Sequence, residues 1–129
     1  MTGEKILVIE DNEQNMYLMQ FLLESKGYTV LQAYNGLDGI KLAENEDPGI
    51  PDIILLDIQL PEMDGYAVAK HLRSIPALEK IPIIAVTSYA MAGDRERILA
   101  AGATDYIEKP INPQTFIDQI KVHLPGNKP

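Results

Sequence analysis

The sequence contains no cysteine and no long apolar run. Without cysteine the chain forms neither disulfides nor thiolate metal sites, which suits a reducing cytoplasm. No apolar stretch approaches the roughly 18 residues of a membrane-crossing helix. The amino-terminal residues also lack the apolar core of a signal peptide. These absences predict a cytoplasmic domain with no membrane segment.

Basic residues are scarce, with 11 against 19 acidic residues and a net charge of −8. Direct DNA binding is therefore disfavoured, because it requires a basic surface that replaces counterions. The two histidines, His71 and His123, are far apart, and neither has a second histidine at metal-ligand spacing. What is present is 129 residues, 46% of them hydrophobic, which predicts one globular domain with a substantial core.

Five short segments have the composition of strands, and three of them are continuous runs of apolar residues. They cover Ile6–Ile9, Thr29–Ala33, Ile53–Leu56, Ile83–Val86 and Asp105–Glu108. Short continuous apolar runs are typical of parallel strands that are buried on both faces. Helices are predicted between and after them, over about 13–26, 36–45, 65–74, 94–101 and 113–123. The expected N-caps are Asn12, Asp64 and Asn112, and the expected stops are Gly27 and Gly102.

Each predicted helix carries apolar residues that we expect to face the sheet. In the first three helices these are Leu18 with Leu22, Met19 with Leu23, then Leu37, Ile40, Leu42 and Ala43, then Val68, Ala69 and Leu72. The strand–helix alternation predicts an α/β domain of the doubly wound (βα)5, flavodoxin-like type, with helices on both faces of a parallel sheet. Such five-stranded sheets commonly have the order 2-1-3-4-5. We expect the domain to span residues 1–124 and the tail 125–129 to be disordered.

In that order the first and third strands are neighbours, and acidic residues follow both of them: Glu10, Asp11 and Asp57. Converging carboxylates repel one another, so they either spread into solvent, protonate or bind a cation. Oxygen ligands of this kind suit Mg²⁺. We expect Asp11, Asp57 and the backbone carbonyl of Gln59 to be direct ligands, with Glu10 acting through a bound water.

Two further strands end in polar residues, Thr87 after the fourth and Lys109 after the fifth. Taken alone, Thr87 could be an ordinary strand threonine and Lys109 a solvated surface lysine. Both interpretations weaken because the same edge of the sheet would also carry the acidic residues. Carboxylates, a hydroxyl and an ammonium group at one edge together predict a functional site.

These residues resemble a known pattern. Glu10-Asp11, Asp57 within Leu-Asp-Ile-Gln-Leu-Pro-Glu-Met-Asp-Gly, Thr87 and Lys109-Pro110 resemble the receiver domain of bacterial response regulators, the CheY-like family, of the stand-alone single-domain type. The match covers about residues 4 to 124. Two departures are Glu10, where many members have aspartate, and the predicted loop Asp47–Pro51, which is a few residues longer than usual. The resemblance also implies the strand order 2-1-3-4-5.

The resemblance implies a phosphorylation-dependent switch in a two-component system or phosphorelay, not a turnover enzyme. Asp57 would accept a phosphoryl group, with Mg²⁺, from a histidine kinase or a histidine phosphotransfer protein. Thr87 and Lys109 would neutralise the transferred charge, and Thr87 with Tyr106 would form the switch. A cis peptide bond is expected before Pro110.

The resemblance also implies where partners bind. The fourth helix, last strand and fifth helix would form the output face toward a downstream protein. On the first helix, Tyr17 and Phe21 are four residues apart and lie off the Leu18–Leu22 stripe. We expect them to be partly exposed and to help dock a kinase or a phosphotransfer helix bundle; packing along the helix flank is the alternative.

Three other functions share part of this pattern. A haloacid-dehalogenase phosphatase normally has a second acid two residues after its nucleophile, where this chain has Gln59. A flavodoxin-like electron carrier needs a phosphate-cradling first loop, which Glu10-Asp11-Asn12 would repel. A phosphate-independent pseudo-receiver is the nearest rival, and the complete set of acids, threonine and lysine argues against it.

Overall fold

The computed structural model describes residues 4–45, 49–60, 64–88 and 92–124. Its strands form one five-stranded parallel sheet in the order β2-β1-β3-β4-β5. Their bounds are β1 (Lys5–Ile9), β2 (Thr29–Ala33), β3 (Ile53–Asp57), β4 (Ile83–Thr87) and β5 (Asp105–Glu108). The predicted strand order and parallel pairing are therefore confirmed.

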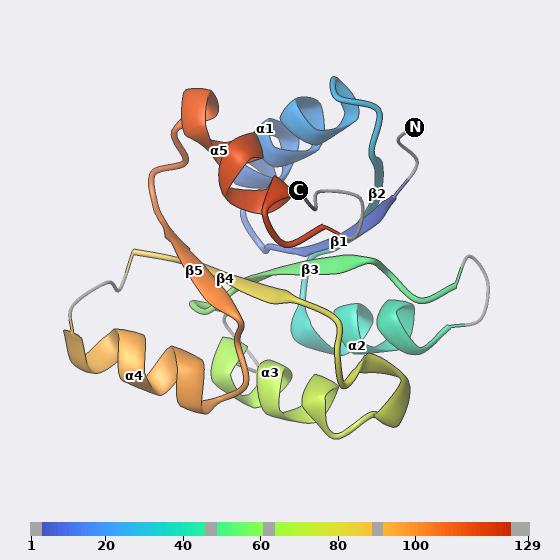
Figure 1. The fold of residues 1–129 in the computed structure, drawn as a ribbon, viewed down its shortest axis with the longest axis vertical. Coiled ribbons are helices and arrows are strands. Elements are labelled where there is room, and N and C mark those ends of the chain that lie inside the picture. Colours follow the sequence, from blue (N-terminus) through green and yellow to red (C-terminus); the bar gives the residue numbers. More distant parts are fainter. Residues whose placement is uncertain (1–3, 46–48, 61–63, 89–91, 125–129) are drawn as a thin grey trace.

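Helices cover both faces of this sheet, as Figure 1 shows, with α1 and α5 on one side and α2, α3 and α4 on the other. Their bounds are α1 (Glu13–Glu24), α2 (Gly36–Glu44), α3 (Gly65–Arg73), α4 (Ala92–Ala100) and α5 (Pro113–Lys121), with a short 3₁₀ helix, η1 (Pro76–Leu78). This is the doubly wound α/β arrangement that the sequence predicts.

Alternate side chains of the central strands fill two separate cores. In β1, Ile6 and Val8 pack with Phe116 on the α1–α5 side, whereas Leu7 and Ile9 pack on the α2–α3 side. The alternation follows from the two-residue period of a strand. Each fully buried side chain of this kind contributes about 1.5–3 kcal/mol of transfer free energy. The central strands are therefore rigid supports for the residues that follow them.

The helix caps match the sequence expectations closely. The side chains of Asn12, Asp64 and Asn112 each accept a hydrogen bond from a backbone N–H in the first turn of the helix that follows. The first helix ends at Glu24, two residues before the predicted end, and Gly27 follows with φ of 90°. The fourth helix begins at Ala92, two residues before the predicted start.

The predicted apolar faces are right for α3 and partly wrong for α1 and α2. In α3, Val68, Ala69 and Leu72 are all buried. In α1 the fully buried residues are Met16, Met19 and Leu23, while Leu18 and Leu22 lie half-buried at the edge of the core. In α2, Leu37 is 57% exposed because Gly36 and Gly39 occupy the buried side and bring the helix close to the sheet.

Two sequence expectations fall outside or at the limits of the described chain. The expected disordered tail, 125–129, lies outside the described residues, and so does part of the predicted loop at 47–51. Within the described residues, no helix has the length and apolar composition needed to cross a bilayer.

Candidate functional site

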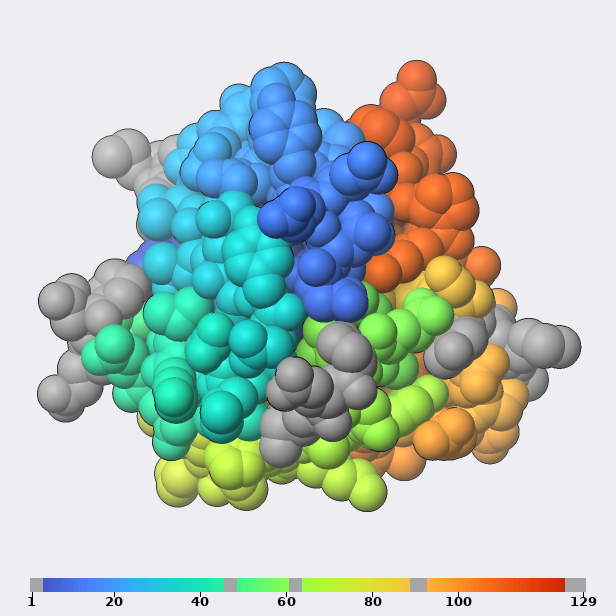
Figure 2. Space-filling view, turned by 180° about the vertical axis from the view of Figure 1, so that it is seen from behind, coloured from blue at the N-terminus to red at the C-terminus, as the bar shows by residue number. Residues whose placement is uncertain are grey.

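Parallel pairing brings the ends of four strands to one edge of the sheet. Ile9 pairs with Leu56, so Glu10 and Asp57 each follow a paired residue and reach the same edge. Thr87 pairs with Glu108, which places Lys109 one position beyond Thr87. In Figure 2 the segments that follow β1 (dark blue), β3 (green) and β5 (orange) meet on one face of the molecule. The predicted convergence of these segments is therefore observed.

The three predicted acids form a cluster at this edge. One carboxylate oxygen from each of Glu10, Asp11 and Asp57 lies within 4.8 Å of the others. Glu10 is fully buried and Asp57 is 2% exposed, whereas Asp11 is exposed to solvent. Among the described residues, the buried polar or charged side chains are Glu10, Asp57 and Thr87. All three belong to the site that the sequence predicts.

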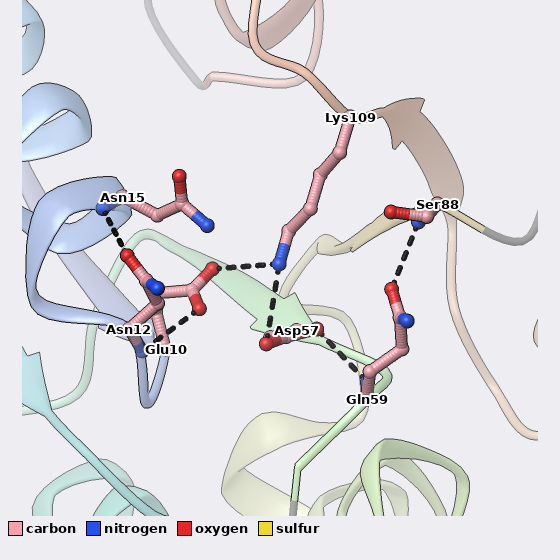
Figure 3. A network of polar contacts seen from close by, with 7 residues as sticks. All are labelled: Glu10, Asn12, Asn15, Asp57, Gln59, Ser88 and Lys109. Carbon is pink, nitrogen blue, oxygen red and sulfur yellow. Dashed lines mark hydrogen bonds and ion pairs between the residues drawn. The ribbon is translucent and has the colours of Figure 1, made fainter.

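Lys109 lies between the two buried carboxylates, as Figure 3 shows. Its Nζ atom is 3.2 Å from Glu10 Oε1 and 3.3 Å from Asp57 Oδ2. The lysine side chain is 15% exposed, so its ammonium group is largely desolvated with the acids. One positive charge therefore faces two carboxylates, and the pocket keeps an excess of negative charge.

Glu10 shows the effect of this excess most clearly. Its Oε2 atom accepts a hydrogen bond of 3.1 Å from the backbone N–H of Asn12. Its Oε1 atom accepts none from the described residues, so the Lys109 contact is an ion pair without hydrogen-bond geometry. Burial, and then the negative charge of Asp57, raise the pKa of Glu10 from 4.5 to about 7.

The backbone after β3 holds the Asp57 carboxylate in place. Its Oδ1 atom accepts a hydrogen bond of 2.8 Å from the backbone N–H of Gln59. The Gln59 side chain reaches across the edge, and its Oε1 atom accepts a 3.0 Å hydrogen bond from the Ser88 N–H (Figure 3). Sequence reasoning missed this bridge between the loops after β3 and β4. No local signal could have revealed it, because the two residues are 29 positions apart.

The two proposed switch residues occupy neighbouring strands. Thr87 is fully buried, and its carbonyl accepts a 2.9 Å hydrogen bond from the Lys109 N–H. Tyr106 is half-buried and packs against a small cluster formed by Ile58, Ala85, Ile98 and Ala103. The Arg95 guanidinium lies 5.3 Å from the centre of the Tyr106 ring. The Lys109–Pro110 peptide bond is cis, as expected.

The donor set fits a hard divalent cation. Three carboxylates gather with a single ammonium group, and the buried Glu10 Oε1 atom lacks a hydrogen bond from the described residues. A cation would relieve both the charge excess and the unsatisfied oxygen. Oxygen ligands with room for water are what Mg²⁺ prefers.

Comparison with known proteins adds an independent observation. The sequence profile of the response regulator receiver domain matches residues 6–121. The chain belongs to this family. The polar-differentiation response regulator DivK of Brucella anthropi is 46% identical to it over 121 residues, which cover 94% of this chain and 96% of DivK.

Solved receiver domains have the same fold. One is the receiver domain of a sensor histidine kinase from Pseudomonas aeruginosa, crystallised with magnesium in its active-site cleft. It is 35% identical, with a TM-score of 0.83 over 93% of this chain and 96% of the other. Another is the chemotaxis protein CheY4 of Vibrio cholerae, which is 25% identical, with a TM-score of 0.88 over 95% and 99%. As a receiver domain, the chain is a signalling module of the two-component type and not a turnover enzyme.

Proposed function

We propose that this receiver domain accepts a phosphoryl group on Asp57 and signals the change through protein contacts. The observation that carries the proposal is the position of Asp57 between Lys109 Nζ, 3.3 Å away, and the Gln59 N–H, 2.8 Å away. A nucleophilic carboxylate needs to be held still and kept ionised. These two contacts hold the carboxylate in place, because each donor faces one of its oxygens.

The transfer proceeds as an in-line displacement. A carboxylate oxygen of Asp57 forms a bond to phosphorus while the P–N bond of a phosphohistidine on the donor protein breaks, and the imidazole leaves. The product is an acyl phosphate on Asp57. Lys109 holds a positive charge beside the phosphoryl oxygens, and the Thr87 hydroxyl donates to one of them.

Asp11, Asp57 and the carbonyl of Gln59 would hold Mg²⁺ directly, and Glu10 would hold one of its water ligands. When bound, Mg²⁺ supplies charge neutralisation for the transferred phosphoryl oxygens. The chain's own contribution is the fixed spacing of the carboxylates, which lie within 4.8 Å of one another on rigid strand ends. The magnesium named in the Pseudomonas receiver structure supports this choice of ion.

Movement of Thr87 toward the phosphoryl group would signal through Tyr106. Thr87 and Tyr106 lie on paired strands, and Tyr106 borders both α4 and the groove between β5 and α5. The face formed by α4, β5 and α5 would then bind the downstream protein. We place this signalling in the cytoplasm, without direct DNA binding.

The phosphodonor protein would dock beside α1. Tyr17 is 70% exposed and Phe21 is 58% exposed, and their rings stack with centroids 6.4 Å apart. Their exposure agrees with the expectation from the sequence. Replacing both with alanine should slow transfer from the cognate kinase and leave labelling by acetyl phosphate unchanged. Equal rates for wild type and variant with both donors would remove α1 from the docking surface.

The test of the whole proposal is labelling by a small phosphodonor with and without Mg²⁺. Wild type should incorporate phosphate only with Mg²⁺, and Asp57→Asn should incorporate none. Asp118→Asn, an exposed acid on α5, is the matched control and should label like wild type. Labelling of Asp57→Asn at the wild-type level would show that the acceptor is another residue.

A further inference from the structure

Helices α3 and α4 enclose a small pocket that lies outside the proposed phosphorylation site. Its volume is about 220 Å³, and it is lined by Tyr66, Lys70, Arg97, Ala100 and Ala101. Tyr66 and Lys70 are four residues apart and share one side of α3, while Arg97, Ala100 and Ala101 share one side of α4. The two alanines leave space that larger side chains would fill. Each helix therefore brings one cation to the rim of the same hollow.

The Arg97 guanidinium lies over an aromatic ring. Its central carbon lies 4.3 Å from the centre of the Tyr66 ring, and that ring packs against the Ile58–Ala85–Ile98–Ala103 cluster. A guanidinium stacked in this way keeps its N–H donors in one plane, available to an oxyanion. Because the ring is fixed by the core, Arg97 has lost part of its side-chain freedom before any ligand binds.

The positive charge of this pocket is not neutralised locally. Neither Lys70 nor Arg97 forms an ion pair or hydrogen bond with any carboxylate that the structure describes. The stretch from residue 65 to residue 100 carries five basic and three acidic residues, in a chain whose net charge is −8. The basic residues are Lys70, Arg73, Lys80, Arg95 and Arg97; the acidic ones are Glu79, Asp94 and Glu96. This region is thus the basic part of an acidic protein.

A third donor is present and unsatisfied. The Tyr66 hydroxyl oxygen is buried and has no hydrogen-bond partner among the described residues. Buried hydroxyls without a partner are uncommon and require an explanation, such as a bound ligand. The pocket is thus lined by a guanidinium, an ammonium and a tyrosine whose hydroxyl lacks a partner among the described residues.

We propose that the α3–α4 pocket is a binding site for a phosphate dianion, held by the Arg97 guanidinium and the Lys70 ammonium, with the Tyr66 hydroxyl as the third donor. Two cations favour a dianion over a singly charged carboxylate. The small volume admits a phosphate group with little attached to it. The site is separate from Asp57 and does not depend on phosphorylation there.

The test is a ¹H–¹⁵N NMR titration of the full chain without Mg²⁺, at constant ionic strength and at a pH where phosphate is dianionic. One arm uses inorganic phosphate and the other uses glycerol 3-phosphate, so that free phosphate and a phosphate ester are distinguished. At least one of these two ligands should change the amide chemical shifts of the pocket residues in a saturable way, with a Kd on the order of a millimolar. The ligand that binds more tightly shows whether the site takes free phosphate or a phosphate ester. The absence of saturable shifts with both ligands overturns the proposal.

Two variants make the test specific. Lys70→Gln with Arg97→Gln should weaken binding by about tenfold or more, because charged hydrogen bonds are lost. Lys41→Gln with Lys80→Gln removes the same charge from exposed positions elsewhere and should leave the Kd unchanged. Equal weakening in both double variants would show a nonspecific charge effect and refute the site. Asp57→Asn should bind like wild type, so this test can fail or succeed independently of the phosphorylation proposal.

Discussion

At the amino ends of the strands a half-buried charge has a hydrogen-bond acceptor on each side-chain nitrogen, whereas at the carboxyl ends buried charges of like sign face one another. Arg73 represents the first case. Its Nε atom donates to the Gly102 carbonyl at 2.8 Å, and Nη1 donates to the Leu78 and Ile81 carbonyls at 2.9 and 2.6 Å. Its Nη2 atom donates to Thr104 Oγ1 at 3.1 Å.

The carboxyl ends hold Glu10 and Asp57 with only Lys109 between them. The two ends therefore differ in role: the Arg73 end stabilises the fold, and the acidic end is the candidate functional site. Arg73 ties the loops before β4 and β5 together, and Gly102 lacks a Cβ that would lie 2.6 Å from Arg73 Cγ. Each of the three Arg73 side-chain nitrogens has an acceptor within the protein, without any ligand. The acidic end is left in electrostatic conflict, which a bound cation can relieve.

The largest expected effect is at the satisfied end. Arg73→Gln should lower the free energy of unfolding by about 2–4 kcal/mol, because several carbonyls lose a charged donor. Urea denaturation measures this change. The control is Lys80→Gln, an exposed neighbour whose effect should stay within about 0.5 kcal/mol. A loss for Arg73→Gln no larger than that of the control would contradict the structural role of Arg73.

At the acidic end, the raised pKa of Glu10 makes stability depend on pH. Its pKa is about 7 in the folded chain, against an ordinary value of 4.5. Between these values the folded state binds more protons than the unfolded state, so without Mg²⁺ this group's contribution to stability falls as the pH rises. Denaturation of wild type and Glu10→Gln across this range should show the fall only in wild type. Parallel curves would mean that Glu10 titrates normally.

Removing one of the opposed acids should stabilise the protein. Asp57→Asn keeps the shape of the side chain, and its oxygen can still accept from the Gln59 N–H. We expect the free energy of unfolding without Mg²⁺ to rise by about 1 kcal/mol, because Glu10 and Lys109 then form a balanced pair. Asp118→Asn should change it little. Destabilisation by Asp57→Asn would show that Asp57 is held mainly as a structural ion-pair partner.

Magnesium should also stabilise the protein, and this effect should depend on the acidic side chains that bind the ion. At about ten times its Kd, Mg²⁺ should raise the free energy of unfolding of wild type by about 1.4 kcal/mol. Thermal melts of wild type, Asp11→Asn and Asp57→Asn test which acids contribute. The rise should shrink in both variants and should be absent with a monovalent salt at matched ionic strength. An undiminished response in both variants would place the cation elsewhere.

The acidic end of the sheet could be predicted from the sequence, whereas the contacts at the opposite end could not. Short apolar runs ending in Glu10, Asp57 and Thr87 predicted both the strands and the edge where they meet, because parallel strands all end on one side. The Arg73 contacts were not predictable, since they join residues up to 31 positions apart and most of them end on backbone carbonyls, which carry no sequence signal. Periodicity placed Leu37 inside, but Gly36 and Gly39 take up the buried side of α2 beside Ile40 and Ala43, and Leu37 is exposed.

The most direct test of the central claim identifies the phosphorylated residue chemically. Wild type is labelled by acetyl phosphate with Mg²⁺, reduced with borohydride to convert an aspartyl phosphate into homoserine, and digested for mass spectrometry. The account predicts homoserine at position 57 and at no other aspartate. Homoserine at another position, or labelled protein that yields none, would contradict the assignment of Asp57 as the acceptor.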